Sequence, residues 1–284
     1  MTNIKTVVDD VYALFGSGKE PDPKDLEELG KAMATHIANA FKKREPRGEL
    51  RASNLGSPCT RKLWYSVNIP EVAEEPKPWA KMKFLYGHLI EELALFLISE
   101  AGHKVTRRQE EVDVGGIKGH LDAVVDGVVV DVKSANSRGM SKFYNNGLLE
   151  ADPFGYLTQI NFYKEGLKDD PEVSKGNTVA FIAVDKELGH IVLDEYKAES
   201  DKILPLVEQT IATTSSHVVP PRGYFPEPDG KSGNMQLGME CKYCPFKHEC
   251  YPGLRVFKYA SGPRYLTRVV KVPDVPEINV ADDN

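Results

Sequence analysis

A run of β-branched residues centred on the dipeptide Asp126-Gly127 constrains the fold of this chain more than any other segment. Asp-Gly is favoured in the two-residue turns of β-hairpins, so the run predicts two antiparallel strands. Counting outward from the turn, Asp122 lies opposite Asp131, and Lys133 follows on the same face. Like charges placed opposite each other destabilise a hairpin, which indicates a cation between the two carboxylates.

A solvated hairpin with a polar outer face is the alternative, because Asp and Lys are common surface residues. The valines and alanines on both sides of the turn argue against it. A strand pair that is covered on both faces holds charged groups only where they have a role. Two carboxylates and a lysine on one face therefore favour metal-dependent cleavage of a phosphodiester.

Composition and charge bound the class of protein. The 284 residues, 41% hydrophobic and 27% charged, suffice for one large globular domain with additions. A net charge of −6 excludes a generally basic surface, so contacts with nucleic acid must come from local clusters. No apolar run approaches the roughly 20 residues that cross a bilayer, and the N-terminus lacks a signal-peptide pattern. We therefore expect a cytoplasmic protein that does not contact membranes.

The four cysteines of the chain are grouped. Three follow a C-x2-C-x5-C spacing as Cys241, Cys244 and Cys250, and the fourth is Cys59. Disulfides are rare in a reducing compartment, so the grouping favours a bound metal or cluster. Zinc and an iron–sulfur cluster both accept four thiolates, and the spacing alone leaves both open. Either group would tie residue 59 to the C-terminal lobe and stabilise both segments.

The order of the predicted elements indicates an α/β core. Helices are predicted from Asp22-Pro23 to Phe41 and over 81–101, 154–168 and 201–213. Strands are predicted over 104–114, 117–133, 177–184 and 190–196. We expect four parts: a helical N-terminal arm (1–50), the α/β core (51–215), a Cys-rich lobe (216–271) and a flexible acidic tail (272–284).

Four further polar residues are candidates for roles at the site that the hairpin predicts. His88 lies in the long helix at 81–101, and a metal held by two carboxylates readily takes an imidazole as a third ligand. Glu92, one turn further on, would orient that imidazole. Alone, such a helical histidine is more often a structural residue. Gln159 and Tyr163 are four residues apart and share one helix face, which by itself says little.

Together these residues resemble the PD-(D/E)XK nuclease superfamily, and within it the RecB-like iron–sulfur branch with its AddB-type and CRISPR-associated adaptation exonucleases. The resemblance covers roughly residues 52–252, with the motifs in the family's order. Leu121 stands where the proline that names the superfamily is found, which leaves the subfamily open. The matching residues are His88, Asp122 within Gly119-x-x-Asp122, Asp131-Val132-Lys133, Gln159, Tyr163, Cys59, Cys241, Cys244 and Cys250.

The resemblance implies a restriction-endonuclease-like core, in which a mixed central sheet is flanked by helices. It implies that His88, Asp122, Asp131 and the carbonyl of Val132 hold Mg²⁺ or Mn²⁺. Lys133 would then place the attacking water and stabilise charge on the phosphate.

The resemblance also implies roles for the remaining motifs. Gln159 and Tyr163 would contact DNA or support the site. The four cysteines would hold a structural iron–sulfur cluster of the 4Fe-4S type in the C-terminal lobe, with zinc as the alternative.

The expected function is a metal-dependent DNA exonuclease that favours single strands or DNA ends in recombination, repair or end processing. The alternatives are a structure-specific or restriction-like endonuclease and a non-catalytic DNA-binding subunit with a structural iron–sulfur cluster. Gly16-Ser17-Gly18-Lys19 resembles a phosphate loop only superficially, because Glu20 stands where Ser or Thr is needed, so ATP-independent activity is expected. The sequence leaves open the cleavage polarity and the choice of DNA or RNA. It also leaves open whether the chain forms a homo-oligomer or acts with a recombination partner protein.

Overall fold

The computed structural model describes residues 3–43 and 45–278 and divides into two compact units. The first unit is built from the chain up to residue 43, from 50–56 and from 79–211. The second is built from 45–49, from 57–78 and from residue 212 onward. Each unit is therefore assembled from segments that are distant in the sequence.

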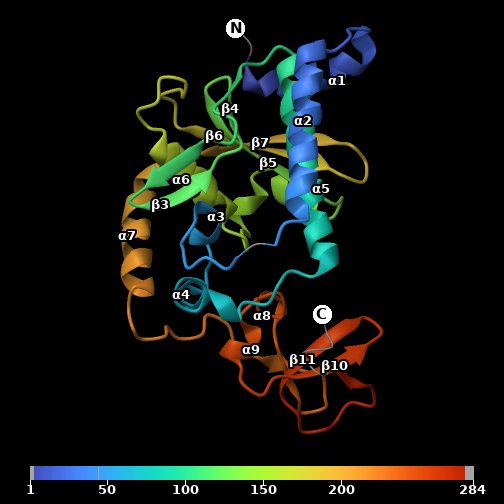
Figure 1. The fold of residues 1–284 in the computed structure, drawn as a ribbon, viewed down its shortest axis with the longest axis vertical. Helices are drawn as coiled ribbons and strands as arrows, with labels where there is room; N and C mark the ends of the chain where they lie inside the picture. The colour runs from blue at the N-terminus through green and yellow to red at the C-terminus, as the bar shows by residue number, and fades with distance from the viewer. Residues whose placement is uncertain (1–2, 44, 279–284) are drawn as a thin grey trace. The chain divides into compact units, whose positions relative to one another are not determined.

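A mixed five-stranded sheet forms the centre of the first unit, in the order β1-β4-β5-β6-β7. Figure 1 labels four of its strands, β4, β5, β6 and β7. Strands β5 and β6 are parallel, and the other neighbours are antiparallel. A parallel pair needs a crossover connection, and helix α6 lies in the segment that joins β5 to β6. The strands are β1 Val105–Thr106, β4 Ala123–Val125, β5 Val128–Ala135, β6 Thr178–Asp185 and β7 Ile191–Lys197.

The predicted hairpin is confirmed as the pair β4 and β5. Its register places Ala123 opposite Val130 and Val125 opposite Val128. The turn residue Asp126 has φ 49° and its neighbour Gly127 has φ 83°, as a type I′ turn requires. The local turn chemistry therefore fixes which side chains share a face of the sheet.

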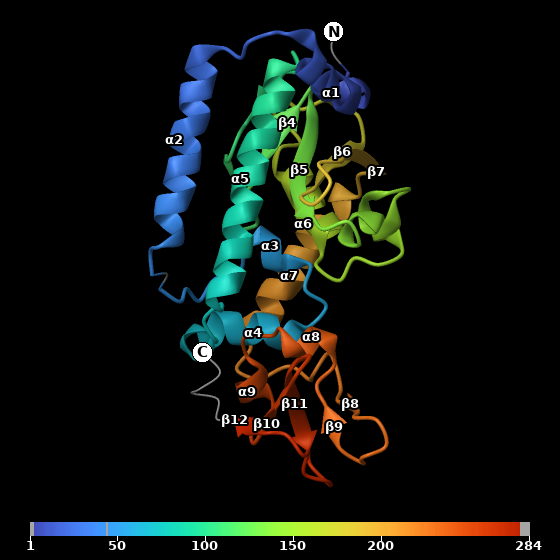
Figure 2. The same cartoon turned by 90° about the vertical axis from the view of Figure 1, so that its right-hand side faces the viewer.

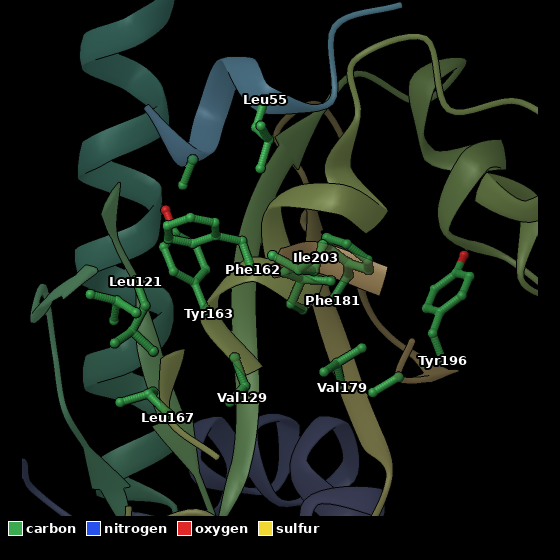
Figure 3. Close-up of a cluster of buried hydrophobic side chains, with 14 of the residues drawn as sticks. Leu55, Leu121, Val129, Phe162, Tyr163, Leu167, Val179, Phe181, Tyr196 and Ile203 are labelled. Atoms are coloured by element: carbon green, nitrogen blue, oxygen red, sulfur yellow. The ribbon is translucent and has the colours of Figure 1, made fainter. Parts of the chain in front are cut away.

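Helices cover both faces of this sheet. Successive residues of a strand point to opposite faces, so the strands contribute to two separate apolar cores. Val129 and Phe181 pack with α3, α6 and α7 in one core, part of which Figure 3 shows. Val130 and Ile182 pack with α1 and α5 in the other. The predicted α/β core is thus confirmed. The helices are α1 Val7–Ser17, α3 Ala52–Leu55, α5 Pro78–Glu100, α6 Tyr156–Gly166 and α7 Ile203–Thr214.

The strands predicted over 104–114 and 117–133 are each interrupted in the structure. Arg107 and Gln109 adopt positive φ angles, which end β1 after two residues. A separate two-stranded sheet follows, formed by β2 Glu111–Val114 and β3 Ile117–His120. The chain then moves into the central sheet at β4, so Asp122 lies at the step between two sheets.

Helix α2, Pro23–Ala40, is the predicted helix of the N-terminal arm. The Asp22 side chain accepts a hydrogen bond from the amide of Lys24 and so caps its first turn. No residue of α2 is buried, and the helix runs beside α5 (Figures 1 and 2). The imidazole of His36 on α2 stacks on that of His88 on α5, with ring centroids 4.8 Å apart.

The second unit contains a sheet that the sequence reasoning did not predict. Its strands follow the order β12-β10-β11-β9-β8, and β10 and β11 form a hairpin (Figure 2). Strand β12 comes from the segment predicted as a tail, whose residues 279–284 lie outside the described residues. The elements are α4 Thr60–Asn68, β8 Glu227–Pro228, β9 Met235–Gln236, α8 Met239–Lys242, α9 Lys247–Cys250, β10 Arg255–Tyr259, β11 Gly262–Arg268 and β12 Glu277–Ile278.

Short 3₁₀ turns complete the described secondary structure. Across residues 3–43 and 45–278, no helix combines the length and apolar character needed to cross a membrane. The 3₁₀ turns are Ile4–Thr6, Pro70–Val72, Gly139–Phe143, Gly147–Leu149 and Ser200–Lys202.

Candidate active site

The charged residues of the hairpin meet around the middle of β5. Asp122 Oδ2 accepts a hydrogen bond of 2.7 Å from the amide of Val132. Through this side-chain acceptor, the pairing of the two strands continues beyond Ala123, the first residue of β4. The ammonium of Lys133 lies 2.5 Å from Oδ2 of Asp131, whose residue is only 1% exposed. Two carboxylates and a lysine are thus brought together as predicted from the turn.

Burial and repulsion act together on these carboxylates. The pKa of Asp122 is raised well above its usual range by burial, and further by the charges of Asp131 and Glu91. Burial also raises the pKa of Asp131, against the attraction of Lys133. Burial disfavours the charged form of Lys133, but the charges of Asp131 and Asp122 outweigh it and raise the pKa of that ammonium. One lysine therefore balances only part of the negative charge at this site.

One carboxylate oxygen of Asp131, Oδ1, is buried without a hydrogen bond to any residue in the described part of the chain. Buried polar atoms are nearly always satisfied, so an orphaned carboxylate oxygen calls for an explanation such as an ion. Divalent cations of the Mg²⁺ class prefer oxygen ligands, and a carboxylate pair with an unused oxygen suits them. The residues present fit such an ion, although no three His, Cys, Asp or Glu side chains within residues 3–43 and 45–278 already stand in metal-binding geometry.

Glu91 on α5 is a candidate that the sequence reasoning missed. It is 8% exposed, and its charge acts on both aspartates. The side-chain amide of Gln109 donates a hydrogen bond to its Oε1. Glu91 could have been considered from its position one helical turn after His88. Glu92 lies at an equivalent distance, so the sequence does not distinguish the two residues.

The structure gives His88 different neighbours from those expected. Its Nδ1 lies 3.9 Å from Oε2 of Glu91, and its side chain is 45% exposed. Glu92, expected to orient it, instead accepts contacts from His36, at 3.1 Å, and from Arg108. Helix α5 directs Glu91 toward the aspartates and Glu92 toward α2. Glu91 therefore lies beside His88 in the place that was expected for Glu92. Ligation of a metal by His88 stays a prediction.

Gln159 and Tyr163 lie beside the hairpin, as their place in the motif order suggested. The Gln159 side-chain amide donates to the Tyr163 hydroxyl at 3.2 Å. Burial raises the pKa of Tyr163, and the charges of Asp131 and Asp122 raise it further. The tyrosine is therefore a neutral, buried group that faces the charged site.

Gly119 of the Gly119-x-x-Asp122 motif permits this close packing. A Cβ at this position would stand 2.4 Å from the Cβ of Ala52 and 3.1 Å from the hydroxyl of Tyr163. Neither atom is the end of a flexible side chain. The glycine thus lets α3 and α6 approach the strand that leads to Asp122.

The four cysteines all belong to the second unit and line one pocket. They are partly buried free thiols. Burial, followed by the three neighbouring cysteines, raises the pKa of Cys241 to about 12. Four sulfurs in one pocket are a donor set that suits zinc or an iron–sulfur cluster. Basic side chains also line the pocket. The basic residues lining this pocket are Arg61, Lys62, Arg222 and Lys247.

Solved structures with a detectable likeness have low sequence identity. SSO0001 shares 19% identity at a TM-score of 0.40, with 77% of this chain and 91% of that chain covered. The alkaline exonuclease LHK-Exo from Laribacter hongkongensis, in complex with dAMP, shares 14% identity at a TM-score of 0.39, with 66% of this chain and 89% of that chain covered. A phage-related exonuclease from Haemophilus somnus 129PT shares 13% identity at a TM-score of 0.38, with 63% of this chain and 94% of that chain covered. TM-scores this low carry no argument about function. No curated protein matches the chain.

A family model gives a far broader match. The model that describes the PD-(D/E)XK nuclease superfamily matches residues 11–251. This range includes the hairpin with Asp122, Asp131 and Lys133 and all four cysteines. The chain therefore belongs to the PD-(D/E)XK nuclease superfamily.

Proposed function

We propose that this protein is a metal-dependent, ATP-independent DNA exonuclease that favours single strands or DNA ends. The observation that carries the proposal is the buried pair of Asp122 and Asp131 with Lys133 beside it and one Asp131 oxygen unpaired. Buried carboxylate oxygens are nearly always paired, so the unpaired oxygen favours a bound cation over a purely structural ion pair. Membership of a nuclease superfamily supports the same chemistry.

In this proposal, Asp122, Asp131, the carbonyl of Val132 and His88 hold Mg²⁺ or Mn²⁺. When bound, the ion lowers the pKa of its water and offsets negative charge on the phosphate. Lys133 stays protonated, because the neighbouring carboxylates raise its pKa, and its ammonium positions water and stabilises charge that develops on the phosphate. The buried setting strengthens that electrostatic stabilisation.

Gln159 and Tyr163 support this site in the proposal. The hydrogen bond from Gln159 fixes the direction of the Tyr163 hydroxyl, which can donate to a carboxylate or to DNA. Its high pKa keeps the hydroxyl protonated at neutral pH, so it acts as a donor and not as a base.

We further propose that the cysteine pocket holds a structural 4Fe-4S cluster, with zinc as the alternative. Four sulfurs would supply every protein ligand that either group needs. The surrounding basic residues would offset the negative charge of four thiolates. Metal analysis and the visible absorption spectrum of anaerobically purified protein separate the two groups.

The experiment that tests the activity uses end-labelled linear and closed circular single-stranded DNA with Mg²⁺, Mn²⁺ or EDTA. Metal-dependent shortening of the linear strand alone supports an exonuclease that serves recombination, repair or end processing. Cutting of the circle would replace it with the endonuclease alternative. Metal binding without cleavage of any DNA form would favour the non-catalytic DNA-binding subunit. Matched RNA substrates establish the choice between DNA and RNA.

A further inference from the structure

An exposed aromatic ring lies next to the charged site. Phe154 is 59% exposed and stands two residues before Tyr156, the first residue of α6. The two rings stack with centroids 5.3 Å apart and an angle of 29° between their planes. The ammonium of Lys133 lies 4.5 Å from the centre of the Tyr156 ring. A continuous line of contacts thus leads from the Asp131 carboxylate through Lys133 and Tyr156 to an aromatic surface in solvent.

The backbone that carries Phe154 is firmly held. Gly155 has φ 71°, and a Cβ there would stand 2.5 Å from the Cα of Gly56, so two glycine backbones touch. The Asp152 carboxylate accepts hydrogen bonds of 2.9 and 2.8 Å from the amides of Tyr156 and Leu157. These bonds satisfy free amides at the start of α6. The exposed ring is therefore presented by an ordered turn next to the catalytic lysine, which lowers the entropic cost of using it for binding.

We propose that Phe154 and Tyr156 form a stacking platform for an unpaired nucleobase of the strand being cut. The platform deepens the proposed function and rests on it. A nucleobase offers a flat π-face to an aromatic ring whatever its sequence, and stacking of this kind is the common way of holding single strands. In a duplex both faces of each base are occupied by its neighbours, so the platform selects single strands and frayed ends.

Charge supports a nucleic-acid strand, in preference to an apolar protein segment, as the occupant. The ammonium of Lys142 lies 4.8 Å from the centre of the Phe154 ring. Its flexible stem lets the charge move from the ring to a backbone phosphate when a base arrives. Together Lys142 and Lys133 place cations at both ends of the aromatic pair, in a chain whose net charge is −6.

The test uses single-stranded oligonucleotides that carry 2-aminopurine or an abasic residue at successive positions near the end. We expect Phe154→Leu to weaken binding, measured with EDTA present, by about 5- to 150-fold, the range for loss of one aromatic stack. Phe154→Trp retains affinity and the quenching of 2-aminopurine. An abasic residue at the stacked position weakens binding by the wild type and adds no further loss in Phe154→Leu. Phe15→Leu, which alters a 75% exposed ring on α1, serves as the matched control and leaves binding unchanged.

Two results would overturn the platform. One is unchanged affinity and quenching in Phe154→Leu. The other is an abasic effect that is equally large in Phe154→Leu and in the wild type. The cleavage assay with metal separates this inference from the proposed function. If the wild type cuts no DNA but quenching still depends on Phe154, the nuclease proposal fails and Phe154 remains only a stacking site for a bound single strand. If the wild type cuts DNA and Phe154→Leu binds normally, only the platform fails.

Discussion

The two units hold their functional side chains by different means. In the first, Asp131 and Lys133 project from β5, which is paired on both sides in the sheet and packed against apolar cores on both faces. In the second, the cysteines lie on or next to short helices, beside a much smaller core. Helices of four residues, such as α8 and α9, have little stability of their own. The first site is therefore built before any ligand binds, whereas we expect the second pocket to depend on what it holds.

Loss of the group held by the cysteines should give the largest effect and should sharpen this contrast. We expect Cys244→Ala to unfold much of the second unit, because structural zinc contributes about 10–16 kcal/mol of binding free energy in comparable small sites. Hydrogen exchange should then be fast in α8 and α9 and stay slow in β5 and β6. Tyr243→Ala, a change at an exposed neighbour, is the control. Equal loss of protection in both units would break the comparison.

Removal of the Lys133 charge should affect activity and leave the fold intact. We expect Lys133→Met to lower kcat by about 10²- to 10³-fold, the usual cost of one preorganised electrostatic group. The remaining carboxylates should still bind Mn²⁺. Steady-state kinetics measure the effect, with Lys168→Met as the control because Lys168 is an exposed lysine that also forms an ion pair, with Glu165. Unchanged kcat in Lys133→Met would remove the lysine from the mechanism.

Gly119→Ala tests the packing that supports the first site. The added methyl group would meet the Cβ of Ala52 at 2.4 Å, so we expect a loss of about 1–3 kcal/mol in the free energy of unfolding. Gly30→Ala on α2 meets no atom within 4 Å and should be neutral or stabilising by up to about 1 kcal/mol. Denaturant unfolding compares them. Equal stabilities would mean that the close approach of α3 and α6 has no energetic role.

The smallest effect concerns pH in metal-free protein. Folding raises the pKa of Asp122, first through burial, so the unfolded chain loses this proton at lower pH than the folded chain. The free energy of unfolding therefore falls as pH rises from the usual aspartate range through the raised pKa. Asp122→Asn removes this contribution, and its melting temperature in EDTA should rise relative to the wild type as pH increases. A constant difference between pH 4 and pH 8 would contradict the raised pKa of Asp122 in the folded chain.

Local sequence signals predicted the geometry of the hairpin well. The Asp126-Gly127 turn sets the register by itself, and the period of two then brings Asp131 and Lys133 to one face. The four-residue spacing of Gln159 and Tyr163 likewise needs only a helix. These predictions of geometry agree with the structure because each depends on residues that are close in the sequence.

Features that depend on distant segments were harder to predict. Glu91 and Glu92 are equivalent in the sequence, and only the packing of α5 against the sheet and of α2 against α5 distinguishes them. Phe154 is an ordinary apolar residue until the fold stacks it on Tyr156. Strands β10 and β11 were missed because basic residues interrupt their apolar pattern.

The central claim is that the buried aspartate pair is a metal site that performs the cleavage. The most direct test titrates Mn²⁺ into the wild type and Asp131→Asn by calorimetry and assays both on linear single-stranded DNA. We predict that the wild type binds the ion and shortens the strand, and that Asp131→Asn loses both properties while it keeps the melting temperature of the metal-free wild type or exceeds it. Cleavage by Asp131→Asn at the wild-type rate would contradict the claim.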